Sequence, residues 1–305
     1  MIAAAGLIAS RFVHYAALTI LFGVAAFPLY NGRSPAASEG AAFFAWSRRM
    51  QITAATLALI SGIFWLGFVA ATMNGELSSL FDPNIVWLVV RTTDFGGVWV
   101  PHLGLIALAF ILLLPKEEST ELRWAVLALS AVALTGIADT GHAGADNGPR
   151  AGMHIAADAA HLLAAGVWIG ALAVLARFVT IAIRKRREDD LKTLDHALSR
   201  FSAIGPVVVA VLTLSGIFNP GFLSSLTTAY GQVLLAKLGL FVAMLLLAAA
   251  NRFWLAPRLT SALASAMDSG GPMRALRASI FAEAALACLV LLAVGWLGTL
   301  APPAH

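Results

Sequence analysis

The chain has 305 residues, of which 60% are hydrophobic and only 12% are charged, and its mean hydropathy is +0.85. Soluble globular domains carry roughly 25% charged residues, so this composition excludes a water-soluble fold. The net charge of +4 does not indicate nucleic-acid binding, because the basic residues lie between apolar segments, where they orient membrane proteins. The sequence predicts an all-α, polytopic membrane protein with a single integral domain over residues 1–305.

Eight apolar segments are long enough to cross a bilayer, a task that takes ~20 residues. The stretch 79–97 is too polar to span, and Trp87 within it predicts a helix at the membrane interface. Residues before the first segment lack the basic region and cleavage site of a signal peptide, so we expect this segment to be retained as a helix. The eight segments lie near 10–30, 51–72, 98–114, 123–140, 154–182, 201–218, 229–250 and 277–300.

The basic residues are concentrated in alternate loops. Fifteen Lys and Arg residues occupy the loops after the first, third, fifth and seventh segments, and the opposite side holds only Arg11, Arg91 and Arg150. The positive-inside rule then places the basic loops in the cytoplasm and both chain ends in the periplasm.

A faint internal repeat links the two halves of the chain, 1–150 and 151–305. The sequence Ser-Gly-Ile-Phe occurs at 61–64 in the second segment and again at 215–218 in the sixth. A period of four helices predicts two halves with the same orientation, a parallel repeat of the kind that some transporters carry. The residues that this register equates are His14 with His161, Gly23 with Gly170, and His102 with Lys237.

The fifth segment opens with three ionisable side chains on one helical stripe. His154, Asp158 and His161 are spaced at i, i+4 and i+7, which places them on the same face of a helix. Imidazole nitrogen and carboxylate oxygen are ligands for borderline divalent ions, and imidazole is well suited to copper. The alternative is a polar helix start in which Asp158 is favoured by the helix dipole. Because ionisable groups are costly inside a membrane, their presence favours a functional role.

Three further histidines are expected at the same membrane face. His14 lies near the outer end of the first segment, His102 at the start of the third, and His142 just after the fourth. Each is either a metal ligand or an interfacial histidine with one hydrogen bond. The acidic, glycine-rich loop at 139–146 either attracts cations or is an ordinary turn. His196, in a basic loop, is expected to be an ordinary exposed residue.

Other features limit the chemistry that the chain offers. Cys288 is the single cysteine, so neither a disulfide nor a cysteine-based metal site is available. The chain has no glycine-rich phosphate loop, and we expect no enzymatic activity such as ATP hydrolysis. Lys237 and Glu283 are membrane charges at different depths that are not expected to touch. Gly166 and Gly170 predict close helix packing.

The run Asp158–Gly170, together with residues 141–143 and the stretch 230–259, resembles the copper resistance protein D family (CopD/PcoD). The resemblance implies a bacterial inner-membrane protein of copper homeostasis that moves copper from periplasm to cytoplasm. It also implies a periplasmic copper-binding partner of the CopC kind. It gives functional weight to His142, Asp158, His161 and Trp168.

Together these observations predict a copper ion captured at the outer ends of the first, third and fifth segments. His154, Asp158 and His161 would form the core of the site, and His14, His102 or His142 would complete it. An alternative is a b-type haem held between His161 and either His14 or His102, as in membrane electron-transfer proteins. A third is a cation sensor without transport.

Overall fold

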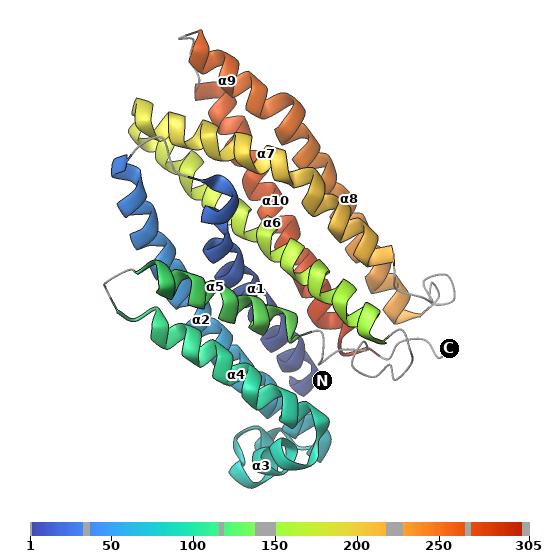
Figure 1. The fold of residues 1–305 in the computed structure, drawn as a ribbon. Coiled ribbons are helices and arrows are strands. Elements are labelled where there is room, and N and C mark those ends of the chain that lie inside the picture. Colours follow the sequence, from blue (N-terminus) through green and yellow to red (C-terminus); the bar gives the residue numbers. More distant parts are fainter. Residues whose placement is uncertain are drawn as a thin grey trace.

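The computed structural model describes residues 2–32, 37–115, 119–137, 151–217, 228–265 and 270–300. Within these ranges the chain forms helices joined by short turns and no strand, which confirms the all-α class (Figure 1). The elements are α1 (Ile2–Asn31), α2 (Ala37–Asn74), η1 (Leu77–Phe81), α3 (Pro83–Thr92), α4 (Asp94–Leu112), α5 (Thr120–Thr135), α6 (Ala151–Lys185), α7 (Glu188–Ile217), α8 (Ala229–Ala250), η5 (Asn251–Leu255), α9 (Ala256–Ala264) and α10 (Gly270–Leu297).

Each of the eight predicted segments corresponds to a helix. Seven candidate spans are found in the described part of the chain, on α1, α2, α4, α6, α7, α8 and α10. The eighth segment corresponds to α5, whose 16 described residues fall short of the ~20 that a bilayer requires. Figure 1 shows α5 returning beside α4 toward the end of the bundle where α1 begins. Residues 138–140 of the predicted segment lie outside the described ranges.

Two helices extend beyond the apolar segments that predicted them. α2 begins at Ala37 rather than near residue 51, and α7 begins at Glu188 rather than near residue 201. The expectation that His196 is an ordinary exposed loop residue is therefore wrong. It lies within α7, is half-buried, and its Nε2 donates to the carbonyl oxygen of Asn31 at 2.8 Å.

The polar stretch 79–97 contains a short helix, as Trp87 predicted. Asp82 begins α3 by accepting a hydrogen bond from the backbone N–H of Asn84 at 2.9 Å, and Pro83 follows in the first turn. Trp87 is exposed, and the guanidinium of Arg91 lies 4.5 Å from the centre of its ring. Thr93 then caps α4, which carries His102.

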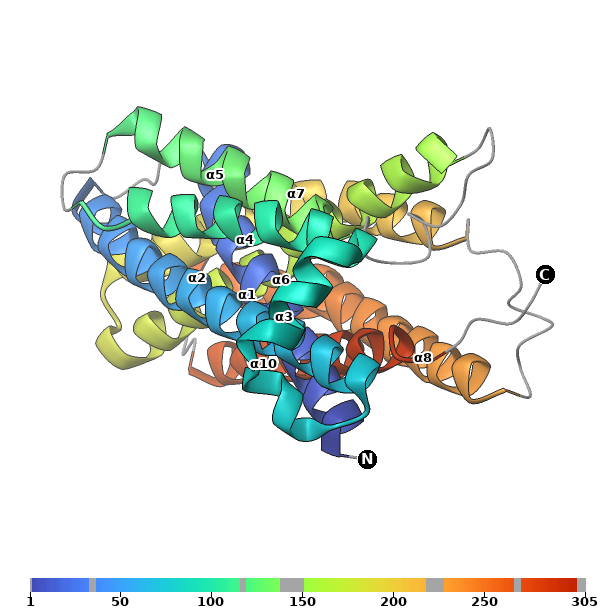
Figure 2. The same cartoon turned by 90° about the horizontal axis from the view of Figure 1, so that it is seen from below.

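The centre of the bundle is the contact between α1 and α6. A Cβ placed on Gly170 would lie 2.3 Å from the carbonyl carbon of Gly23, so only glycine allows this approach. The predicted close packing at Gly166 and Gly170 is confirmed. Helices α4 and α5 lie on one flank of this pair, and α8 and α10 lie on the other (Figure 2).

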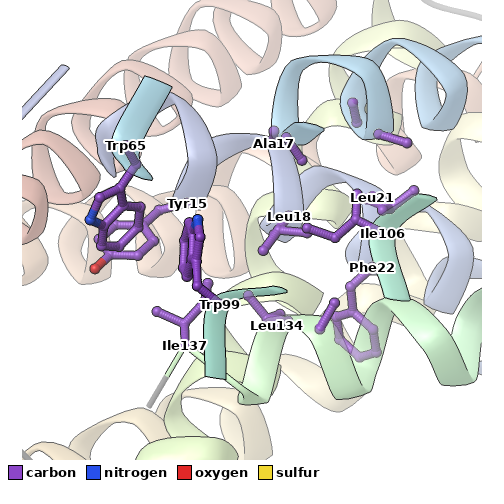
Figure 3. Close-up of a cluster of buried hydrophobic side chains, with 14 of the residues drawn as sticks. Tyr15, Ala17, Leu18, Leu21, Phe22, Trp65, Trp99, Ile106, Leu134 and Ile137 are labelled. Carbon is purple, nitrogen blue, oxygen red and sulfur yellow. The ribbon is translucent and has the colours of Figure 1, made fainter. Parts of the chain in front are cut away.

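The apolar core divides into two main clusters. One joins α1, α2, α4 and α5 and contains Leu18, Trp65 and Trp99 (Figure 3). The other joins α6, α7, α8 and α10 with the end of α1. The last turns of α10 pack beside the first turns of α1, since Gly295 approaches the backbone of Ile8, so both helix ends lie at the same end of the bundle.

Candidate metal centre

Two of the predicted ligands, His14 on α1 and His102 on α4, meet inside the bundle. Their Nε2 atoms are 2.9 Å apart, and the two side chains are 0% and 3% exposed. The chain segments that carry them are 88 residues apart, so the packing of α1, α2 and α4 creates the pair.

The hydrogen bonds around this pair define which ring nitrogens carry a proton. His14 Nδ1 lies 2.9 Å from the carbonyl oxygen of Ala58, which can only accept, so Nδ1 is the donor. In the neutral ring, His14 Nε2 therefore carries a lone pair and accepts from the Nε2–H of His102. We assign these tautomers from the bonding network. The remaining nitrogen, His102 Nδ1, then holds a lone pair.

That lone pair of His102 is buried without a hydrogen-bond partner among the residues that the structure describes. Buried polar atoms without a partner are uncommon and call for an explanation such as an ion. A Cβ on Gly136 would lie 3.7 Å from this nitrogen, so the lone pair faces the end of α5. His142, the predicted ligand beyond α5, lies outside the described residues.

Aromatic rings surround the histidine pair and hold its geometry. Trp99 stacks on His102 with centroids 4.8 Å apart, and Trp65 meets His14 edge to face at 5.6 Å. The indole N–H of Trp99 donates to the carbonyl oxygen of Gly62 at 3.0 Å, which fixes the ring on which His102 rests. A Cβ on Gly62 would approach the His14 ring to 3.2 Å, so a larger residue would crowd it.

The donor set of this pair suits a copper ion. With metal–nitrogen distances of ~2.0 Å, as in zinc sites, two imidazole nitrogens on one ion lie at least ~3.3 Å apart in tetrahedral geometry. A separation of 2.9 Å therefore needs to widen by only a few tenths of an ångström. The Nδ1–H of His14 bonded to a backbone carbonyl is also the outer contact that metal-binding histidines use to fix their orientation.

The predicted stripe on α6 lies in different surroundings. The Nδ1 of His161 donates to Ser215 Oγ on α7 at 2.9 Å, and Ser215 in turn donates to the Val211 carbonyl. Lys237 of α8 interacts electrostatically with both Asp158 and His161. His154 interacts with Asp158 in the same way, one turn nearer the start of α6.

The structure does not bring the six predicted ligands into one site. Among the described residues, no group of three His, Cys, Asp or Glu side chains is placed to hold a metal ion. His14 precedes Gly23 by nine residues and His161 precedes Gly170 by nine, which is about two and a half helical turns. Each histidine therefore points away from the glycine contact, and the two rings face opposite flanks.

The positions of these histidines do not fit the haem alternative. His161 contacts α7 and does not face His14 or His102 across a gap. His14 and His102 are in direct contact, so no porphyrin ring fits between them. Neither pair has the arrangement of two axial ligands on opposite faces of one iron.

A buried carboxylate lies deeper in the C-terminal half. Glu283 of α10 is 1% exposed and accepts hydrogen bonds from the indole N–H of Trp168 at 2.5 Å and the amide of Asn251 at 3.0 Å. The family resemblance gave functional weight to Trp168, and Asn251 lies in the stretch 230–259 that carries this resemblance, although no role was predicted for it. As predicted, Glu283 and Lys237 have separate partners.

Sequence reasoning also missed the residues that position the histidines. The carbonyl of Ala58 leaves no sequence signal, because every residue has one. Ser61 and Ser215 did leave a signal, since both open the repeated Ser-Gly-Ile-Phe sequence. The repeat therefore contained the information that each serine lies beside a histidine.

Comparison with known proteins identifies relatives over the whole length of the chain. The family model described as Copper resistance protein D-like, N-terminal domain, matches residues 1–153, and that described as Copper resistance protein D matches residues 195–297. The chain is 33% identical to Copper resistance protein D of Pseudomonas syringae pv. tomato, over 97% of this chain and 96% of that protein.

Two further relatives agree. The chain is 31% identical to Inner membrane protein YebZ of Escherichia coli K12, over 97% of this chain and 98% of that protein. It is 29% identical to Copper transport protein CutJ of Bacillus subtilis 168, over 80% of this chain and 46% of that protein. No solved structure matches the chain.

Proposed function

The chain belongs to the copper resistance protein D family, and from that premise we propose that it binds periplasmic copper between His14 and His102 and carries it across the inner membrane. The observation that carries this proposal is the 2.9 Å contact between the two Nε2 atoms inside the bundle. Copper is the cargo of this site.

The hydrogen bonds of this pair and the rings around it favour metal binding. A metal ion between the rings would replace the proton that His102 Nε2 donates to His14 Nε2. Because His14 Nε2 already presents a lone pair, only His102 has to lose or move a proton. The electron-rich faces of Trp65 and Trp99 stabilise a cation that has left water, because cation–π attraction strengthens in desolvated surroundings. The proton on His102 Nε2 can move to Nδ1 of the same ring, which frees Nε2 to bind the metal ion.

The ionisable residues at the start of α6 are not assigned to the His14–His102 site. Asp158 and His154 lie near the beginning of α6, at the end of the bundle predicted to face the periplasm. That His154, Asp158 and His161 themselves bind copper stays a prediction, as does a contribution from His142. Lys237 interacts electrostatically with Asp158 and His161, and its positive charge opposes a metal cation there. His14 and His102 are therefore the first pair to test.

The partners in this proposal follow from the family and the fold. Copper would be delivered from a periplasmic binding protein of the CopC kind, and the helices would lie in the lipid bilayer of the bacterial inner membrane. The relative YebZ is named as an inner membrane protein and CutJ as a copper transport protein.

Metal analysis of the purified protein tests the site. We expect wild-type protein to retain copper after gel filtration, and His14→Ala and His102→Ala to lose it. His196→Ala is the matched control, because His196 bonds a backbone carbonyl at the far end of α1. Unchanged copper content in both site variants would rule out this pair.

Two measurements separate the proposal from its rivals. We expect a visible spectrum without a Soret band. Redox-sensitive haem bands would instead show that the chain binds haem and would contradict the copper proposal. Copper uptake into proteoliposomes distinguishes transport from sensing, and His14→Ala is expected to abolish that uptake. Binding without uptake by wild-type protein would leave capture as the function and reject transport.

A further inference from the structure

The helices of the two halves pack in the same pattern. Within α1, α2, α4 and α5, the first helix packs on the second and the fourth, and the third packs on the fourth. The same three contacts join α6, α7, α8 and α10. One difference between the halves is that α2 packs against α4, whereas residues of α7 and α8 line a cavity of about 370 Å³.

The contact at the centre of the bundle joins two equivalent residues. Gly23 and Gly170, which the sequence repeat pairs, lie against each other, and a Cβ on either would clash with the backbone of the other. A residue that contacts its own counterpart lies at a twofold axis. For helices that run in the same direction, this axis follows the length of the bundle, as in parallel-repeat transporters.

Each half then holds a histidine against a serine on its second helix. His14 contacts the Ser61 hydroxyl and also bonds the carbonyl of Ala58, and His161 contacts the Ser215 hydroxyl. Both serines donate their own proton to the carbonyl four residues before them.

The third helix supplies a different group in each half. In the first half, His102 completes the pair with His14. In the second half the equivalent position holds Lys237, which interacts with His161 and with Asp158. An ammonium group is a compact charge on a flexible stem, so it can occupy a position where a metal ion would otherwise sit.

We infer that Asp158, His161 and Lys237 form a second ion site, equivalent to the His14–His102 site, in which the Lys237 ammonium takes the place of a bound metal ion. The inference rests on the proposed function, because it assigns copper binding to the first site. The carboxylate of Asp158 supplies the negative charge that a cation requires, and the tethered cation keeps copper out of the site. On this inference the wild-type chain binds copper in one half only, which replaces the sequence prediction that His154, Asp158 and His161 form the core of the copper site.

Substituting Lys237 by histidine tests this site. Lys237→His removes the tethered cation and restores the ligand type found at His102, so we expect it to bind one more copper ion per chain than wild type. Copper and protein are measured on the same purified sample, under reducing and under oxidising conditions. Nitrogen coupling in the spectrum of bound divalent copper would identify imidazole ligands at the added site.

Two control variants assign the added ion. Lys237→Leu removes the charge without adding a ligand and is expected to bind no more copper than wild type. The double variant Lys237→His with His161→Ala is expected to lose the added ion. Gel filtration confirms that each variant is folded before its copper content is compared.

The outcomes separate this inference from the proposed function. If folded Lys237→His gains no copper, or if His161→Ala alone lowers the copper content of the wild-type chain, the second site is not as described. If wild type binds no copper and Lys237→His binds one ion, the inference stands and the proposed function fails. A double-mutant cycle on thermal stability, using Asp158→Asn and Lys237→Leu, is expected to show coupling; additive losses would contradict the pairing of Lys237 with Asp158.

Discussion

The two halves of this membrane protein place a histidine at the same depth and surround it with different charges. In the N-terminal half, His14 meets a second imidazole, and the guanidinium of Arg11 lies over Trp65, whose ring contacts His14. In the C-terminal half, His161 interacts electrostatically with Lys237, which also interacts with Asp158. One packing arrangement thus holds a pair of imidazoles in one half and, in the other, an imidazole that interacts with a lysine. The helix framework sets the positions, and one or two side chains set the chemistry.

Making the first half resemble the second is the strongest test of this comparison. His102→Lys replaces a ligand by a cation that cannot coordinate while protonated, so tight copper binding should fall more than about 100-fold, beyond the ten- to hundredfold cost of losing an outer contact. Copper titration of the purified protein measures the change. His102→Gln serves as the uncharged control and should also lose tight binding. Copper affinity equal to wild type in His102→Lys would remove His102 from the site.

Disturbing the axis between the halves should affect both of them. Gly170→Val places a side chain against the backbone of Gly23, and overpacking of this kind costs about 1–3 kcal/mol or more. We expect a clear loss of thermal stability in detergent. Gly104→Ala and Gly239→Ala are matched controls, because an added Cβ at either position meets nothing within 4 Å. Gly170→Val with a wild-type melting temperature would mean that α1 and α6 do not pack at this contact.

Removing the buried carboxylate should affect the C-terminal half alone. Glu283→Ala leaves the donors of Trp168 and Asn251 without an acceptor, and each unpaired buried group costs about 1–3 kcal/mol. Glu283→Gln keeps one acceptor oxygen and should lose less stability. Copper binding at His14 and His102 should be unchanged when binding is measured below the melting temperature. A copper loss in folded Glu283→Gln would show that the two halves are not independent.

Substituting the two serines should have the smallest effect on copper affinity, and it should distinguish the two halves. Ser61→Ala removes a contact of 3.3 Å to His14 but leaves the shorter bond to Ala58, so copper affinity should fall about tenfold or less. Ser215→Ala alters the equivalent contact of His161 and should leave wild-type copper binding unchanged. Equal losses in the two variants would indicate that copper binds in both halves.

The sequence alone was sufficient for most of the fold. Eight apolar segments predicted the positions of eight helices, because the low solubility of charged groups in a bilayer limits where a span begins and ends. It could not define helix ends outside the membrane, where hydropathy no longer distinguishes helix from loop. α2 and α7 therefore extend further than predicted, and His196 lies in a helix.

For the site, the sequence identified the residue types and their depth, whereas the tertiary structure decided which of them meet. Spacing predicted that His154, Asp158 and His161 share a stripe, but it did not predict what that stripe faces. The glycine contact between α1 and α6 fixes the rotation of both helices, so His14 and His161 point to opposite flanks despite their equal depth. Only the packing of α4 against α2 brings His102 to within 2.9 Å of His14, and only the packing of α8 against α10 places Lys237 where it interacts electrostatically with His161. Periodicity along one helix carries no information about its partner, because the partner face depends on side-chain shape across the interface.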